Sequence, residues 1–230
     1  MKIIAHIYTD FPEKFGIPRQ SGLVPSLQAK IIFEQEYRNP DALRGLEGYS
    51  HIWLLWQFSE AIRKNWSPTV RPPRLGGKKH QGVFATRSPF RPNPIGLSSV
   101  KLERIELDSK EGPIIYISGA DLMNGTPIYD IKPYLPFTDC HPEAVGGFAE
   151  NYADYHLEVQ IAEELLVQIP SEKRESLLGV LAQDPRPSYQ NDEERIYGIS
   201  FGTQNIRFRV AGDILTVVAV EQLKAAKEEL

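Results

Sequence analysis

Residues 51–58 read His-Ile-Trp-Leu-Leu-Trp-Gln-Phe, a nearly continuous run of apolar and aromatic side chains. The run is too short for most helices and rich in aromatic residues, so it predicts a strand that is buried on both faces. On either side of it, 40–47 and 59–65 are predicted to be helical. Short apolar segments between Pro- and Gly-rich loops predict further strands at 3–8, 31–33, 82–85, 98–105 and 114–118. Several short strands without alternating helices favour a mainly β fold, a barrel or a sandwich, over a doubly wound sheet.

The pattern changes after residue 148, where one clear helical segment appears among strands. Residues 172–182 carry leucines at helical spacing, with Ser171 as the predicted N-cap and Asp184-Pro185 as the stop. Around this helix a strand is predicted at 155–161, and a small antiparallel meander at 196–201, 206–210 and 215–220. The expected organisation is a β domain over 1–148 and a small α+β domain over 149–230, joined at Gly146-Gly147.

Composition places the chain among ordinary globular proteins. It has 230 residues, 41% of them hydrophobic, and 26 basic against 30 acidic side chains. The single thiol, Cys140, cannot form an internal disulfide, which fits a reducing compartment. No apolar stretch approaches the ~18 residues of a membrane span, and the N-terminus meets charge too early for a signal peptide. We therefore expect a soluble, cytoplasmic protein.

The charge is unevenly distributed along the chain. Residues 1–150 hold 18 basic and 16 acidic side chains, whereas 151–230 hold 8 and 14. Residues 61–101 contain no Asp or Glu, and their basic side chains lie among prolines and glycines. A stiff cationic loop suits a polyanion, although a solvated surface is the alternative interpretation. The side chains predicted to contact the phosphates of such a polyanion are Arg71, Arg74, Lys78, Lys79 and Arg91.

Several common chemistries have no signature in this sequence. There is no His-Glu-x-x-His, Cys-x-x-Cys or Gly-x-Ser-x-Gly motif, and no Gly-x-Gly-x-x-Gly or Walker loop follows a predicted strand. Thiolate zinc sites, hydrolase triads and Rossmann-type cofactor binding are therefore not predicted, and no metal is expected.

Two stretches carry unusual residues. Residues 82–97 hold three prolines together with Arg87 and Arg91, which predicts either a rigid strand connection or a loop whose guanidinium groups bind a carboxylate or phosphate. Residues 118–134 contain the turn signal Asn124-Gly125, and small residues at a strand end that would let a flat ligand approach the backbone. In this second stretch Asp121 and Asp130 are candidate partners for ribose hydroxyls or an amine, or else turn caps.

Taken together, these motifs resemble the TsaA-like family, whose characterised members are S-adenosylmethionine-dependent tRNA methyltransferases of the TrmO type. The resemblance spans nearly the whole chain, over segments 15–20, 44–53, 68–77, 86–96, 121–136 and 181–189. It implies a β-barrel methyltransferase with a small C-terminal domain, active as a homodimer. The implied reaction is methylation of N6 of threonylcarbamoyladenosine at position 37, beside the anticodon of a threonine tRNA.

The same resemblance implies where S-adenosylmethionine binds. Members of the family have Pro-Gly after the Pro-Arg-Gln triplet, whereas this chain has Ser21-Gly22 there. Arg19 or Arg87 is expected to hold the methionine carboxylate, and no general base is identified. The implied cofactor residues are Pro18, Arg19, Gln20, Phe58, Ser59, Arg87, Leu97, Ser118, Gly119, Ala120 and Asp121.

Two questions stay open at the level of the sequence. A barrel that binds tRNA or a nucleotide without catalysis is the alternative to an enzyme, although a pure binder would not need the complete set of cofactor residues. The acidic domain over 149–230 could contribute shape, dimer contacts, or a few contacts through Arg186, Arg207 and Arg209.

Overall fold

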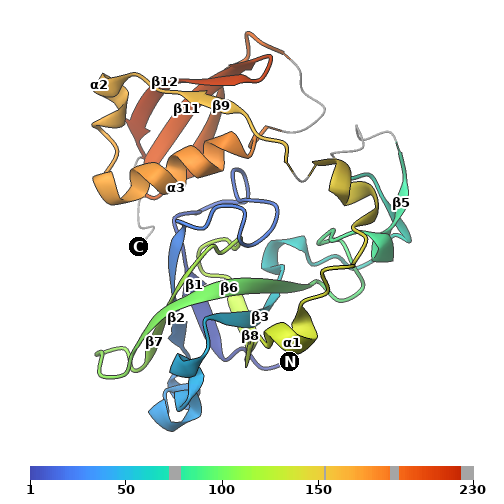
Figure 1. Ribbon diagram of the computed structural model, residues 1–230, viewed down its shortest axis with the longest axis vertical. Coiled ribbons are helices and arrows are strands. Elements are labelled where there is room, and N and C mark those ends of the chain that lie inside the picture. The colour runs from blue at the N-terminus through green and yellow to red at the C-terminus, as the bar shows by residue number, and fades with distance from the viewer. Residues whose placement is uncertain (73–78, 153, 187–191, 224–230) are drawn as a thin grey trace.

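The computed structural model describes residues 1–72, 79–152, 154–186 and 192–223. Six antiparallel strands close into a barrel in the order β1-β2-β7-β6-β3-β8 (Figure 1). The closed barrel confirms the predicted fold class. Its strands are β1 (Ala5–Tyr8), β2 (Gln28–Phe33), β3 (His51–Gln57), β6 (Ile95–Glu106), β7 (Ile114–Ser118) and β8 (Pro127–Pro133).

Strand β3 shows how the sequence specifies the barrel. Ile52, Leu54 and Trp56 point into the core, whereas the alternate residues Trp53 and Leu55 are only half-buried. The prediction that both faces of this strand are buried is therefore wrong. In a closed barrel every strand has one inner and one outer face, and the outer face of β3 is only partly covered.

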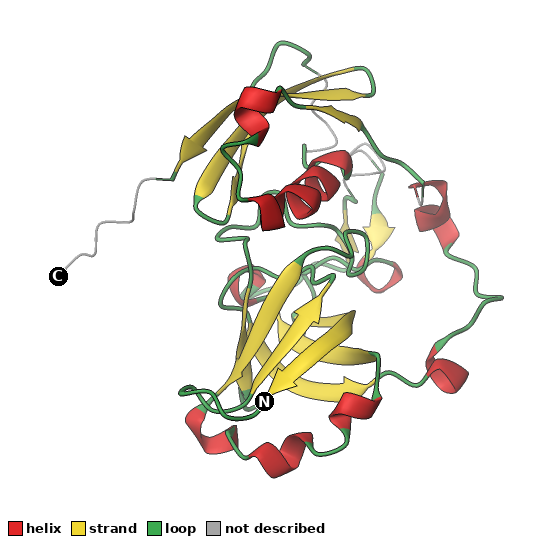
Figure 2. Ribbon diagram, turned by 60° about the vertical axis from the view of Figure 1, so that its left-hand side comes forward, coloured by secondary structure: helices red, strands yellow, loops and turns green. Residues whose placement is uncertain are grey.

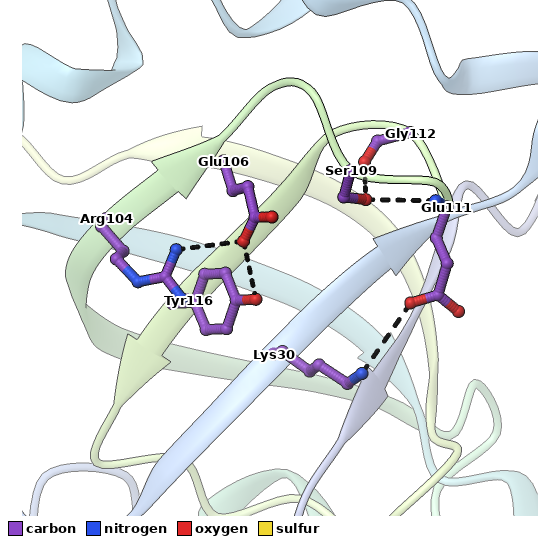
Figure 3. Close-up of polar contacts among 7 residues, drawn as sticks. All are labelled: Lys30, Arg104, Glu106, Ser109, Glu111, Gly112 and Tyr116. Carbon is purple, nitrogen blue, oxygen red and sulfur yellow. Dashed lines mark hydrogen bonds and ion pairs between the residues drawn. The ribbon is translucent and has the colours of Figure 1, made fainter.

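Polar contacts hold the barrel wall together at the hairpin between β6 and β7 (Figure 3). The Glu106 carboxylate accepts hydrogen bonds from Arg104 Nη1 at 3.1 Å and from the Tyr116 hydroxyl at 2.9 Å. The Arg104 guanidinium also lies 3.4 Å from the centre of the Tyr116 ring. In the turn itself, Ser109 Oγ donates to the carbonyl of Gly112, and Lys30 on β2 reaches toward Glu111.

The described parts of the long connection between β3 and β6, residues 58–72 and 79–94, are mostly irregular. They contain the two-stranded ribbon β4 (Thr69–Val70) and β5 (Gln81–Gly82), with 3-10 turns at Ser59–Ala61 and Val83–Ala85. The strand predicted over 82–85 is therefore wrong beyond Gly82. Val83 donates its backbone N–H to the carbonyl of Pro68, and the hydroxyl of Thr86 donates to the carbonyl of Val83, which closes the turn.

The helices predicted in the first domain are also shorter than expected. Residues 40–47 form two 3-10 turns, Pro40–Leu43 and Leu46–Gly48, and the segment after β3 forms only one. A further 3-10 turn lies at Gln35–Tyr37, helix α1 covers Pro136–Asp139, and a 3-10 helix covers Gly147–Tyr152.

The C-terminal part is a four-stranded sheet, of order β10-β11-β12-β9, with helix α3 packed on it. The predicted meander and helix are confirmed, and β9 adds a parallel edge to the sheet. Ser171 is the first residue of α3 rather than its cap, because Pro170 precedes the helix and no side chain caps it. The elements are β9 (Glu158–Gln160), α2 (Glu163–Leu166), α3 (Ser171–Ala182), β10 (Tyr197–Phe201), β11 (Gln204–Ala211) and β12 (Ile214–Gln222).

The second hydrophobic core crosses the expected domain boundary. Three fully buried residues of the β1–β2 loop, Phe11, Val24 and Leu27, lie in one cluster with Leu177, Phe201 and other residues of the C-terminal sheet and helix. Figures 1 and 2 both show α3 lying between its own sheet and the loops at this end of the barrel. The second core is thus built from the whole C-terminal domain and one loop of the barrel.

None of the helices in the described ranges has both the length and the apolar character needed to cross a bilayer.

Candidate cofactor and tRNA site

All predicted cofactor residues lie at one end of the barrel or just beyond it. Strands β1, β3 and β7 end there, and their antiparallel neighbours β2, β6 and β8 begin there. The segments that carry the site are the β1–β2 loop (residues 9–27), the long β3–β6 connection and the β7–β8 loop. Residues as distant in sequence as Gln20 and Asp121 therefore come to the same rim.

A hydrogen-bonded chain runs from the barrel core to this rim. Trp56 Nε1 donates to Ser98 Oγ at 3.0 Å, and Ser98 Oγ donates to Asp121 Oδ1 at 2.6 Å. Ser98 is buried and Trp56 is nearly so, which fixes the orientation of the hydroxyl. These hydrogen bonds orient the carboxylate of Asp121, which also interacts with the backbone of Ser21 and with its own backbone.

Gly96 makes room for this arrangement. It pairs with Trp56 across β3 and β6, and a Cβ added at Gly96 would lie 2.2 Å from a carbon of the Trp56 ring. Only a residue without a side chain lets the indole lie flat against β6 and reach Ser98.

Asp121 also faces the cationic side of the rim. Burial raises the pKa of its carboxyl, while the Ser98 hydrogen bond, the charge of Arg87 and the backbone of Ser21 act in the opposite direction. Arg87 itself is exposed, and its Nη1 donates to the side-chain oxygen of Gln20. Gln20, Arg87 and Asp121 thus form one group with a positive and a negative end.

Backbone hydrogen bonds connect the two loops that carry Gln20 and Asp121. Gly22 donates its N–H to the carbonyl of Gly119 at 2.9 Å, and the N–H of Gly119 donates to Leu27 at 2.8 Å. Ala120 is buried in the barrel core directly before Asp121. Pro18 is buried, whereas Arg19 is exposed. These two bonds hold the residues just after Gln20 against the residues just after β7.

The other predicted cofactor residues lie around this group rather than in it. Phe58 packs on Trp56 with ring centres 4.2 Å apart, and its backbone N–H bonds to Pro94, while Ser59 begins the following 3-10 turn. Leu97 lies on the outer face of β6 and is 56% exposed. Ser118 points along the wall, where its hydroxyl donates to Glu103.

Arg91 stabilises the conformation of the proline-rich loop over residues 82–97. Its Nη1 donates to the carbonyls of Thr86 at 2.7 Å and Val83 at 3.3 Å, and the side chain is half-buried. A phosphate contact by Arg91 would have to compete with these bonds. The bonds of Arg91 support the interpretation of residues 82–97 as a rigid connection, whereas the exposed Arg87 leaves the ligand-loop interpretation a prediction.

Of the other basic residues predicted to contact tRNA, the structure describes two. Lys79 is exposed, and Arg71 is exposed with its Nε 3.0 Å from Nε2 of His80. Arg74 and Lys78 lie outside the described residues.

Asp130 does not join the cofactor group. Its carboxylate pairs with Lys132 at 2.9 Å and accepts the N–H of Ile131. Just after β8 ends, Tyr134 packs on the ring of Trp53 from β3. Trp53 Nε1 also donates a hydrogen bond to Asp139 at 2.7 Å. The second aspartate singled out in residues 118–134 is therefore part of the outer wall.

No group of three or more His, Cys, Asp or Glu side chains within the described ranges could hold a metal ion. An open hollow lined by Lys2, Ile3, His6 and residues 34–37 lies where β1 begins and β2 ends, at the opposite end of the barrel from Asp121. The hollow contains none of the predicted site residues.

Sequence reasoning missed Trp56, Gly96, Ser98 and Ser21 as parts of the site. The available signal was Ser98, a hydroxyl at an inward position of an otherwise apolar alternation in β6. A buried polar side chain needs a partner, and here that partner is the site carboxylate.

Known proteins resemble this chain over its whole length. The family model described as "tRNA-methyltransferase O N-terminal domain" matches residues 6–140, and the one described as "TrmO C-terminal domain" matches 154–223. The tRNA (adenine(37)-N6)-methyltransferase of Escherichia coli (strain K12) is 42% identical over 226 residues, which are 95% of this chain and 96% of that protein. A Pseudomonas aeruginosa protein named "Putative S-adenosylmethionine-dependent methyltransferase RcsF" is 40% identical over 204 residues, which are 85% of this chain and 86% of that protein. The crystal structure of TrmO from P. aeruginosa has a TM-score of 0.76 at 33% identity, covering 96% of this chain and 95% of that one.

The fold and these domain matches define the class, a tRNA methyltransferase built on a closed barrel instead of a Rossmann sheet. The chain belongs to the TrmO family. The family resemblance found in the sequence is thereby confirmed.

Proposed function

We propose that this protein transfers a methyl group from S-adenosylmethionine to N6 of threonylcarbamoyladenosine at position 37 of a threonine tRNA. The observation that carries the proposal is the meeting of Gln20, Arg87 and Asp121, from three separate loops, at one rim of the barrel. Membership of the TrmO family and the names of the E. coli and P. aeruginosa relatives support the reaction. A cytoplasmic location is part of this proposal and is consistent with a tRNA substrate.

The residues at the rim fit the chemistry of S-adenosylmethionine. Its methionine carboxylate matches the exposed guanidinium of Arg87, since arginine binds carboxylates with two parallel hydrogen bonds. Its ammonium, sulfonium and ribose hydroxyls match Asp121, whose second carboxylate oxygen is not used by Ser98. The flat adenine suits stacking on the Phe58 ring, which is only partly buried where it packs on the barrel core.

The chain's own residues would act by orienting the reactants. S-adenosylmethionine supplies the methyl group when it is bound. Transfer needs the acceptor nitrogen in line with the carbon–sulfur bond, at ~3–3.5 Å from the methyl carbon. A rigid rim therefore raises the rate of transfer more than tight binding alone does. Asp121, fixed through Ser98 and Trp56, holds a negative charge toward the cationic part of the cofactor. Position 37 lies in a single-stranded loop, where presenting a base costs less than in a duplex.

Arg87→Ala is the most direct test of the cofactor assignment. We expect cofactor affinity to fall by roughly tenfold to a hundredfold, because one charge-assisted contact is worth about 1.5–3 kcal/mol. Isothermal titration of the full-length protein with S-adenosylmethionine measures the change. The melting temperature serves as the control, because Arg87 is exposed and contributes little packing. Parent-like affinity in Arg87→Ala would show that the guanidinium does not contact the cofactor.

The exposed basic residues of the β4–β5 ribbon are the proposed contacts to tRNA phosphates. We expect the pair of charge reversals Arg71→Glu and Lys79→Glu to weaken tRNA binding and to lower the slope of log K against log salt by about 1 for each lost phosphate contact. Binding measured at several salt concentrations gives that slope, and cofactor affinity should not change. An unchanged slope would assign these residues to solvated surface.

We also propose that the enzyme is a homodimer, as the family resemblance implies. Large apolar side chains are exposed on the β3–β6 connection and the start of β6, with Phe84 72% and Leu97 56% exposed. Exposed apolar surface of this kind is typical of protein interfaces. A second copy covering Leu97 would also bring that residue into the cofactor site, where the resemblance places it. Sedimentation equilibrium should then give twice the chain mass of 26.1 kDa.

The sequence also left open a barrel that binds tRNA or a nucleotide without chemistry, which membership of the TrmO family disfavours. Incubation of the protein with tRNA and methyl-labelled S-adenosylmethionine separates the two functions. Label in the tRNA supports the enzyme, whereas tight tRNA binding without label would favour the binding module.

A further inference from the structure

The loop that carries the predicted Pro18-Arg19-Gln20 segment begins on the C-terminal domain. The Asp10 carbonyl accepts the N–H of Gly202 at 2.7 Å, and the Asp10 carboxylate forms an ion pair with Lys173 of α3. Phe11 follows, 1% exposed, with its ring edge-on to Phe201 at a centre distance of 5.6 Å. The start of the loop is therefore fixed by the turn between β10 and β11 and by the first turn of α3.

The end of the same loop is fixed by α3 as well. Val24 and Leu27 are buried in the C-terminal core, and the hydroxyl of Ser176 donates to the carbonyl of Ser26 at 2.7 Å. Gly179 lies directly against Val24, since a Cβ added there would be 2.6 Å from Val24 Cγ1. Both ends of the loop thus rest on the C-terminal domain.

Between these two ends, the loop turns toward the barrel rim. Gln20 meets Arg87, the Ser21 backbone interacts with Asp121, and Gly22 bonds to Gly119. The loop therefore joins two parts of the molecule, with its ends held by one domain and its middle placed in the site of the other.

We propose that the C-terminal domain positions the cofactor loop, so that affinity for S-adenosylmethionine depends on the packing of α3 against Val24. The inference rests on the proposed function, because it takes the Pro18–Gly22 segment as part of the cofactor site. A loop held in its bound conformation loses little entropy when the ligand docks, whereas a displaced loop binds only in the fraction of molecules that have the right conformation. The residues of this contact, chiefly Val24, Ser176 and Gly179, are positioning residues and do not touch the cofactor.

The substitution Gly179→Ala tests the contact with the smallest change. Alanine is a better helix former than glycine, so α3 itself is favoured, while the new methyl pushes on the stiff Val24 side chain. We expect the dissociation constant for S-adenosylmethionine to rise by about fivefold or more, as the population of the competent loop falls. In methylation assays the KM for the cofactor should rise, with kcat at saturating cofactor and the KM for tRNA unchanged.

A second substitution provides the rescue. Val24→Ala removes the methyl group that Gly179→Ala would meet, so the double variant should return to within about twofold of the parent affinity. Gly198→Ala is the matched control, because the three atoms nearest to its added Cβ all belong to the Asn205 side chain of the same sheet. Gly198→Ala should bind the cofactor like the parent.

The outcomes separate the inference from the proposed function. Parent affinity in a folded Gly179→Ala protein, or an affinity loss that Val24→Ala does not rescue, would overturn the inference. If Gly179→Ala does not fold, Ser176→Ala gives the same test by deleting only the bond to Ser26, with an expected loss of about threefold and parent-like affinity as the contradicting result. A parent protein that binds no S-adenosylmethionine would instead overturn the proposed function.

Discussion

Replacing Asp121 by Asn is expected to weaken S-adenosylmethionine binding by about tenfold to a hundredfold, a loss typical of a charged hydrogen-bonding partner. The isosteric amide can still accept the Ser98 hydrogen bond, so the rim keeps its shape and loses only its negative charge. Titration calorimetry on the full-length variant measures the effect. Asp130→Asn is the matched control, because Asp130 pairs with Lys132 on the outer wall and should leave the affinity within about twofold of the parent.

The same variant should be at least as stable as the parent near neutral pH. Burial raises the pKa of the Asp121 carboxyl, so the folded protein holds its proton more tightly than the unfolded chain does. The folded state therefore loses stability as pH rises from the unfolded pKa, about 3.9, through the raised folded value, and Asp121→Asn removes that loss. Denaturant unfolding at about pH 3 and about pH 7 gives the free energy of unfolding of the parent and of Asp121→Asn at the two sides of this pH range. A variant less stable than the parent at neutral pH would contradict the assignment of desolvation as the dominant cause.

Gly96→Val is expected to lower the free energy of unfolding by about 2–3 kcal/mol, the upper part of the range for overpacked cores. Its Cβ would lie 2.2 Å from the Trp56 ring, which cannot move without giving up its bond to Ser98. For a chain of this length, the melting temperature should fall by about 5–10 °C. Asp121 would also lose its orientation, so cofactor binding should weaken in the protein that still folds.

Gly82→Val is the control for Gly96→Val, because it makes the same replacement of glycine by valine at another strand position. Gly82 lies in the short strand β5, and a Cβ added there meets no atom within 4 Å. The control should shift the melting temperature by less than about 2 °C, as surface substitutions usually do. Equal losses in both variants would remove the special role assigned to the contact between Gly96 and Trp56.

The sequence predicted most of the barrel because its strands follow simple local signals. The run 51–58 and the segment Ile114–Ser118 are short, apolar and bounded by loop residues, and both are strands. Residues 82–85 carry the same apolar composition, yet Val83–Ala85 forms a 3-10 turn. Its backbone bonds come from Pro68, Thr86 and Arg91, which are tertiary or loop partners that local periodicity cannot identify.

The cofactor group was predictable only in part, and for a similar reason. Arg87 and Asp121 could be singled out because charged residues stand out in loops of Pro and Gly. Trp56 looked like a core residue and Gly96 like a turn, because their roles depend on the register between β3 and β6. The sharing of residues 9–27 between the two domains follows from the packing of Phe11, Val24 and Leu27, which a division of the sequence at residue 148 does not reveal.

The most direct test of the central claim is mass spectrometry of tRNA nucleosides. Threonine tRNA that carries threonylcarbamoyladenosine at position 37 is incubated with the full-length protein and S-adenosylmethionine, then digested to nucleosides. We expect this nucleoside to gain the mass of one CH2 group, with no gain when the cofactor is omitted and a smaller gain when Asp121→Asn is used at limiting cofactor. An unmodified nucleoside after incubation with folded, cofactor-bound protein would contradict the claim.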